Sequence, residues 1–135
     1  MVESNGYPGQ VKNAIDTTTL SQYDYANDGG GRRTSVKHSG AAFETGSAFN
    51  KYDYNTRSEV ITGDRYWGAN LTDISDPVDG QSFAYGYDNI GNRTASLREN
   101  EEMNYTANNL NQYTQRTIPN GIDILGSAET NTTVT

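Results

Sequence analysis

The sequence predicts an all-β fold in which consecutive antiparallel hairpins form a curved or rolled sheet. Tyrosines recur at positions i and i+2, which places both rings on one face of a β-strand. A cluster of Asp, Asn and Gly follows each tyrosine pair, and these residues reverse the chain because they tolerate left-handed backbone or cap turns. No stretch of the 135 residues shows a convincing helical period.

This strand-and-turn pattern occurs four times, and a second alternating run after each turn completes a β-hairpin. The third and fourth copies align without a gap, so that Ile90 falls on Leu110 and Thr94 on Thr114. Successive copies begin 29, 33 and 20 residues apart, so we expect insertions in the two longer intervals. The four segments are Tyr23 to Gly29, Tyr52 to Ser58, Tyr85 to Thr94 and Tyr105 to Thr114.

Three regions follow from this pattern. Residues 1–20 are expected to be a loosely ordered N-terminal segment, and residues 21–120 form the hairpin repeats. Residues 121–135 are expected to be a C-terminal strand or tail that ends inside a Thr-rich stretch, which suggests a truncation. The best loop within the repeats is Asn70 to Ser82, because it contains Asp-Pro and Asp-Gly pairs.

Composition narrows the classes of partner. The formal net charge of −7 argues against nucleic acid and against docking on anionic lipid. A cationic or neutral partner fits better, and glycans are the obvious neutral class. The chain has no Cys and one His, which leaves no disulfide framework and no multi-His metal site. Leu, Ile, Val and Phe make up about 16% of the chain, so we expect a thin core built largely from the 10 Tyr.

Two stretches carry a family resemblance, Tyr85-Gly-Tyr-Asp-Asn-Ile-Gly-Asn-Arg93 and Tyr105-Thr-Ala-Asn-Asn-Leu-Asn-Gln-Tyr113. Both resemble the repeat of the YD-repeat (Rhs-repeat) family, and the resemblance extends over roughly residues 20 to 120. It implies a short part of a bacterial repeat array, secreted or on the cell surface, in which hairpins coil into a large sheet and contact partners and carbohydrate. No catalytic residue is carried over from the family.

The resulting functional prediction is a structural or interaction module, carbohydrate-binding and self-associating. Self-association is expected because uncapped repeats leave strand edges that can pair with another chain, giving a homo-oligomer or an edge-to-edge assembly. Tyr66 and Trp67 are the predicted ligand-binding residues, since aromatic faces stack on sugar rings. The alternative for Trp67 is that it anchors the small core.

A small glycoside hydrolase is the alternative function, using a carboxylate pair near Trp67. The catalytic candidates are Glu44, Glu59 and Asp64, because such hydrolysis needs one carboxyl as acid and one as base or nucleophile. These carboxylates could equally lie on turns and on the solvent face of strands. Asp73, Asp76 and Asp79 are calcium candidates, although they could equally form a solvated acidic loop. No other cofactor is predicted.

Overall fold

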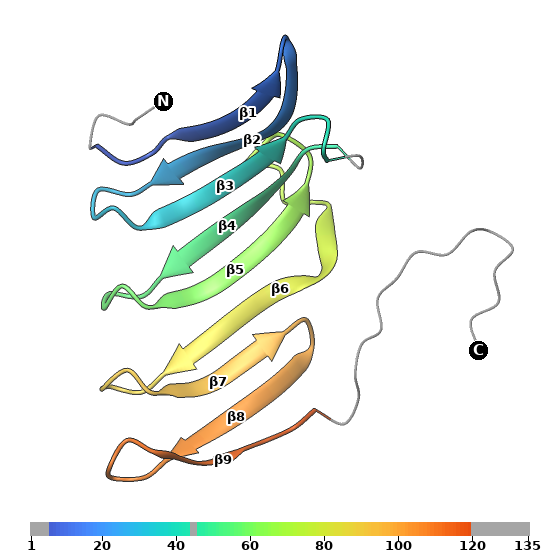
Figure 1. The fold of residues 1–135 in the computed structure, drawn as a ribbon. Coiled ribbons are helices and arrows are strands. Elements are labelled where there is room, and N and C mark those ends of the chain that lie inside the picture. Colours follow the sequence, from blue (N-terminus) through green and yellow to red (C-terminus); the bar gives the residue numbers. More distant parts are fainter. Residues whose placement is uncertain (1–5, 44–45, 120–135) are drawn as a thin grey trace, which may run out of the picture.

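The computed structural model describes residues 6–43 and 46–119, which form one nine-stranded antiparallel sheet whose strand order follows the chain (Figure 1). The described residues contain no helix, so the prediction of an all-β fold built from consecutive hairpins is confirmed. The strands are β1 (Gln10–Ile15), β2 (Thr18–Asn27), β3 (Arg33–Ser39), β4 (Ala48–Tyr54), β5 (Val60–Trp67), β6 (Pro77–Tyr87), β7 (Arg93–Arg98), β8 (Glu101–Ala107) and β9 (Tyr113–Arg116).

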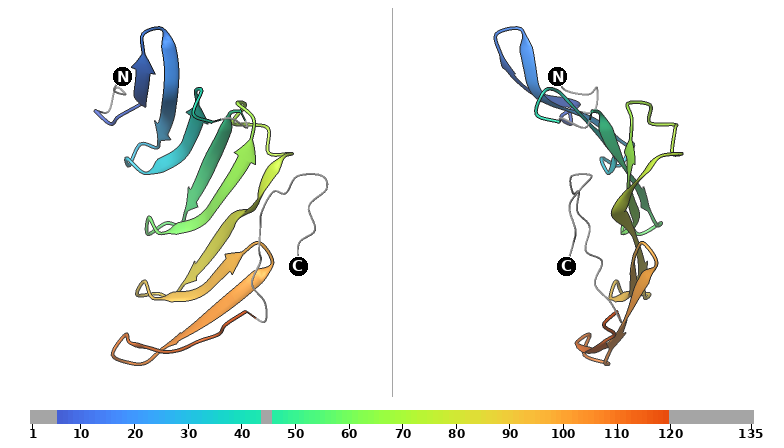
Figure 2. Two further views of the ribbon diagram at one scale, coloured as in Figure 1. Left: turned by 45° about the vertical axis from the view of Figure 1, so that its right-hand side comes forward. Right: turned by 90° about the vertical axis from the view of Figure 1, so that its right-hand side faces the viewer.

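The described part of the chain is a single curved layer of strands, as the two views of Figure 2 show. No second sheet or helix covers either face within these residues, so few side chains are fully enclosed. Phe49 is completely buried, and its ring stacks on Tyr66 with 5.4 Å between ring centroids. The core is therefore as thin as predicted, but it is not built from tyrosines: the buried hydrophobic residues among those described are Ala48, Phe49 and Val78.

The four repeats correspond to the hairpins β2–β3, β4–β5, β6–β7 and β8–β9. Their turns lie side by side at the same end of the strands (Figure 1). Each turn has five residues, and its first side chain accepts hydrogen bonds from the backbone N–H groups of the third and fifth. In the third repeat, Asp88 Oδ1 accepts from Ile90 at 3.0 Å and from Asn92 at 2.8 Å. The equivalent first residues are Asp28, Asn55 and Asn108.

The fourth residue of every turn has a left-handed backbone, which explains why Gly or Asn is favoured there. The φ angle is 80° at Gly31, 92° at Gly91, 60° at Asn111 and 65° at Ser58. Local chemistry therefore specifies each reversal of the chain.

Side chains also connect each of these turns to the next one. Arg32 Nη1 donates to the backbone oxygen of Asn55 at 3.3 Å, and Arg57 Nη2 donates to the backbone oxygen of Asp88. Asn92 Nδ2 reaches Asn111 Oδ1 at 3.5 Å. The turns are thus connected in series as well as through the strands.

Two regions differ from the boundaries expected from the sequence. Residues 10–15, within the segment expected to be loosely ordered, form β1, because they pair with β2 and Gln10 donates to Asp24 at 2.6 Å. Strand β6 begins at Pro77, inside the predicted loop from Asn70 to Ser82; proline is tolerated at the first residue of a strand. The expected C-terminal strand or tail, residues 121–135, lies outside the described residues.

Candidate functional site

The tyrosine pairs of the repeats lie on one face of the sheet, which we call the aromatic face. Residues directly opposite each other on paired strands share a face, and the register connects Tyr25 to Val36 and Val36 to Asn50. Tyr52 lies two residues beyond Asn50 and therefore on the same face. The rings of this face include Tyr23, Tyr25, Tyr52, Tyr54, Phe83, Tyr85, Tyr87 and Tyr105.

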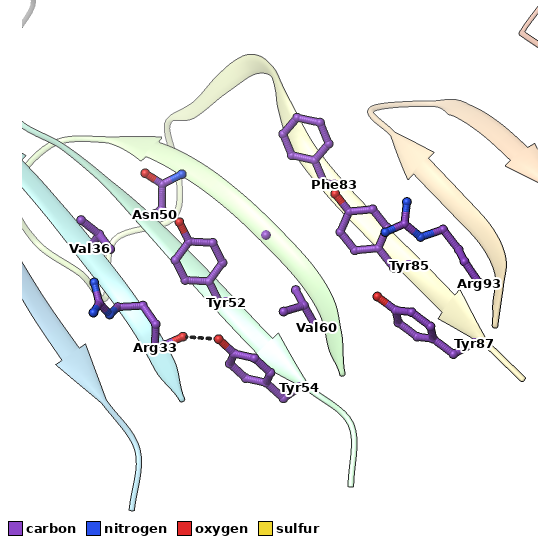
Figure 3. A pocket seen from close by; sticks show the side chains of 11 residues that line it. Arg33, Val36, Asn50, Tyr52, Tyr54, Val60, Phe83, Tyr85, Tyr87 and Arg93 are labelled. Atoms are coloured by element: carbon purple, nitrogen blue, oxygen red, sulfur yellow. Dashed lines mark hydrogen bonds between the residues drawn. The ribbon is translucent and has the colours of Figure 1, made fainter. Parts of the chain in front are cut away.

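A hollow of about 700 Å³ lies in the middle of this face, lined by residues from β3 to β7 (Figure 3). This volume is within the range of roughly 300–1,000 Å³ that is typical of small-ligand sites. Five aromatic rings and two guanidinium groups dominate its lining. They belong to Tyr52, Tyr54, Phe83, Tyr85, Tyr87, Arg33 and Arg93.

Gly63 on β5 explains why the sheet is hollow at this point. Gly63 lies opposite Tyr52 on β4 and opposite Phe83 on β6, so a position between two rings carries no side chain. A Cβ at this position would meet only the Tyr52 ring, at 3.5 Å, which is an ordinary contact. Nothing in the packing therefore requires glycine here, and its effect is to leave space between the rings.

Two arginines occupy equivalent places in their repeats, immediately after the five-residue turn. The Arg33 guanidinium lies over the ring of Tyr25, with 4.0 Å from Cζ to the ring centroid, and its Nε donates to Asn27 Oδ1 at 3.1 Å. The Arg93 guanidinium lies over the ring of Tyr85 at 4.6 Å. No Asp or Glu is among the residues that line the hollow. The hollow thus presents cations in a chain whose net charge is −7.

The tyrosine hydroxyls supply the remaining polarity of the hollow. Tyr54 Oη donates to the backbone oxygen of Arg33 at 2.8 Å, which holds that ring in place (Figure 3). Burial, followed by the neighbouring Tyr54, raises the pKa of Tyr52, so this phenol keeps its proton at neutral pH. Tyr52 can therefore donate a hydrogen bond to a ligand.

Tyr66 and Trp67, the ligand-binding residues predicted from the sequence, lie on opposite faces of β5 because successive side chains alternate along a strand. Tyr66 stacks on the buried Phe49. Trp67 shares the aromatic face with Arg65, whose Cζ is 6.0 Å from its ring centroid, but Trp67 does not line the hollow. The two rings do not form one platform.

The catalytic candidates are not assembled into a pair. Glu59 is the fifth residue of the second turn, and hydrogen bonds from Asn55 and then Arg57 lower the pKa of its carboxyl. Asp64 lies five residues along β5 and accepts a hydrogen bond from Ser82 Oγ at 2.8 Å. The strand rise of about 3.3 Å per residue puts the Cα atoms of Glu59 and Asp64 roughly 16 Å apart, and an odd separation along a strand turns the two side chains to opposite faces. Glycosidases need their two carboxyl groups roughly 5–9.5 Å apart. Glu44 lies outside the described residues.

The calcium candidates lie on the connection between β5 and β6 and at the start of β6. Asp73 Oδ1 accepts hydrogen bonds from the backbone N–H and the hydroxyl of Ser75, at 3.2 and 2.6 Å. The backbone oxygen of Asp76 accepts from the N–H of Trp67 at 2.9 Å. Across residues 6–43 and 46–119, no group of three or more His, Cys, Asp or Glu side chains is arranged to hold a metal ion.

The sequence drew attention to the tyrosines of the hollow but not to the functional role of Arg33, Gly63 and Arg93. A signal for the arginines was present, since each directly follows the turn of a repeat that opens with a tyrosine pair. No comparable signal exists for Gly63, because its two ring neighbours come from strands whose register is set by long-range pairing.

Comparison of the sequence with protein-family models and with curated proteins finds no match to either. In the part of the chain that the structure describes, no helix has the length and apolar character needed to cross a membrane.

Proposed function

We propose that this chain is an interaction module of a secreted or cell-surface YD-repeat scaffold, and that it binds saccharides on the aromatic face. The observation that carries the proposal is the hollow around Gly63, where rings from β4 and β6 line an uncovered surface. A pyranose ring has apolar C–H faces and hydroxyl edges. Tyrosine offers the complementary combination of a flat apolar ring and a polar tip.

The rings of the hollow are held before any ligand arrives. They lie on neighbouring strands of one hydrogen-bonded sheet, and the Tyr54 hydroxyl and two stacked arginines fix their surroundings. Such preorganisation favours binding because little side-chain freedom remains to be lost. It also favours a binding role over a hydrolytic one, since no carboxylate lines the hollow.

Titration calorimetry against a panel of neutral and acidic oligosaccharides tests this function. Tyr52→Ala and Tyr85→Ala are each expected to weaken saccharide binding by about tenfold or more, because each removes a ring from the lining. Tyr7→Ala is the matched control, since Tyr7 is 43% exposed and does not line the hollow. Unchanged affinity in both pocket variants, or no binding to any member of the panel, would reject the proposal.

We also propose self-association through strand edges, for which β1 provides a specific observation. It is the first strand of the sheet, so one of its sides has no partner strand among the described residues. Its side chains Val11 and Ile15 are 45% and 62% exposed. Exposed apolar strand edges pair readily with other chains. Light scattering coupled to size exclusion should show concentration-dependent assembly that Lys12→Pro reduces, because the N–H of Lys12 points away from β2. A monomer at every concentration would reject this proposal.

A further inference from the structure

The hollow differs in charge from the opposite face of the sheet. On the face opposite the hollow, acids and bases are mixed, as in the Lys37–Asp24 ion pair at 3.5 Å. The hollow itself is lined by Arg33 and Arg93 and by no carboxylate. We propose that the ligand of this site is an acidic oligosaccharide whose sugar rings carry carboxylates, that is, a uronic-acid chain. This inference rests on the proposed saccharide-binding function and specifies its substrate class.

Neither of the two arginines is neutralised by a carboxylate of a described residue. The ion pairs between described residues are Arg32–Asp28, Lys37–Asp24 and Arg57–Glu59, and neither pocket arginine takes part in one. Each guanidinium instead lies over a tyrosine ring, and Arg93 also hydrogen-bonds to the hydroxyls of Tyr105 and Tyr87. These contacts orient the planar forks. An arginine fork matches the two oxygens of a carboxylate, and less freedom is lost because the fork is already oriented.

A third arginine adds to the positive charge of this face. Arg65 lies two residues from Gly63 and opposite the lining residue Asn50, which places it on the same face. Its Nε is buried and has no hydrogen-bond partner among the described residues. Arg65 does not line the hollow, so it adds positive charge near the site but no direct ligand contact.

The spacing of the pocket arginines favours an extended ligand. Arg33 is on β3 and Arg93 on β7, each directly after a turn, so four strand spacings of about 4.8 Å separate them by roughly 19 Å. Aromatic rings occupy the interval between them. A ligand with flat rings and repeated carboxylates therefore fits better than a single sugar. It also fits better than an acidic peptide, whose carboxylates are carried on flexible chains.

The test compares tetragalacturonate with its fully methyl-esterified form, which keeps the rings but removes the charges. We expect calorimetry to show about tenfold or more tighter binding of the acid than of the ester. Raising the salt from 50 to 200 mM should narrow this difference. Arg33→Gln and Arg93→Gln should each weaken acid binding by roughly five- to tenfold and leave ester binding unchanged. Lys51→Gln is the matched control, because this exposed cation alternates with Tyr52 on β4 and so lies on the opposite face.

The outcomes separate this inference from the proposed function. Equal affinity for acid and ester, or binding only of other neutral glycans, would overturn the acidic ligand and leave saccharide binding in place. No binding to any glycan would overturn both. Binding of oligoglutamate as tightly as tetragalacturonate would overturn the saccharide in favour of an acidic polypeptide. If a glutamine variant fails to fold, as judged by thermal denaturation, the acid–ester comparison on the unaltered chain still decides the question.

Discussion

Replacing Gly63 should increase stability while it removes function. Glycine inside a strand is unfavourable by about 0.5–1 kcal/mol relative to alanine, because its backbone loses more freedom on folding. Replacing Gly63 by alanine should remove this whole cost. Its φ angle is outside the left-handed region, and a new Cβ would meet only the Tyr52 ring, at 3.5 Å.

Gly63→Ala should therefore raise the free energy of unfolding by about 0.5–1 kcal/mol, which corresponds to a rise of about 2–5 °C in Tm. Gly63→Val should be at least as stable, because β-branched residues favour strands. The two added methyl groups would project between the rings of Tyr52 and Phe83 and occupy the floor of the hollow. We expect this variant to lose about tenfold or more of the saccharide affinity.

Thermal denaturation and calorimetry on the same preparations provide the two readouts. Gly86→Ala is the control for stability, because a Cβ there would lie 3.1 Å from Thr94 Oγ1 and the gain should be smaller or absent. A valine variant that binds saccharide as well as the unaltered chain would refute the role of Gly63 in shaping the site. An alanine variant less stable than the parent would refute the packing argument.

Three further predictions concern the turns and pH. Asn108→Ala should lower stability by about 1–2 kcal/mol in denaturant unfolding, because two backbone N–H groups lose their acceptor, whereas Asn108→Asp should be nearly neutral. Asn55→Asp should be destabilising by the same measurement, since Asn55 Nδ2 donates to the carboxylate of Glu59, and equal tolerance at both positions would contradict this reading. Burial, and then the charge of Arg65, lowers the pKa of His38 from 6.5. Below about pH 6.5 the unfolded chain therefore binds a proton more readily than the folded chain, and the free energy of unfolding should decline as the pH falls. His38→Gln should flatten that part of the pH profile of stability.

The repeated turns could be predicted from the sequence because their chemistry is local. Each five-residue turn is closed by a side chain that bonds to N–H groups two and four residues later, as Asp88 does. A left-handed residue at the fourth position, such as Gly91, completes the reversal. Tyrosines at i and i+2 must also share a face of their strand, whatever the rest of the fold does. These features determine hairpins, and hairpins in series determine an antiparallel sheet.

The site depended on information that no short segment contains. Glu59 and Asp64 are near each other in sequence, yet an extended strand separates them too far for paired acid–base chemistry. The hollow exists because Gly63 lies opposite Tyr52 and Phe83, and that alignment depends on the register of three strands, including an irregularity between Asp53 and Tyr54. A shift of one residue would turn the glycine to the other face. Sequence alone thus determined the hairpins and their aromatic face. Only the tertiary pairing of strands decided where the hollow lies on that face, because register is a long-range property.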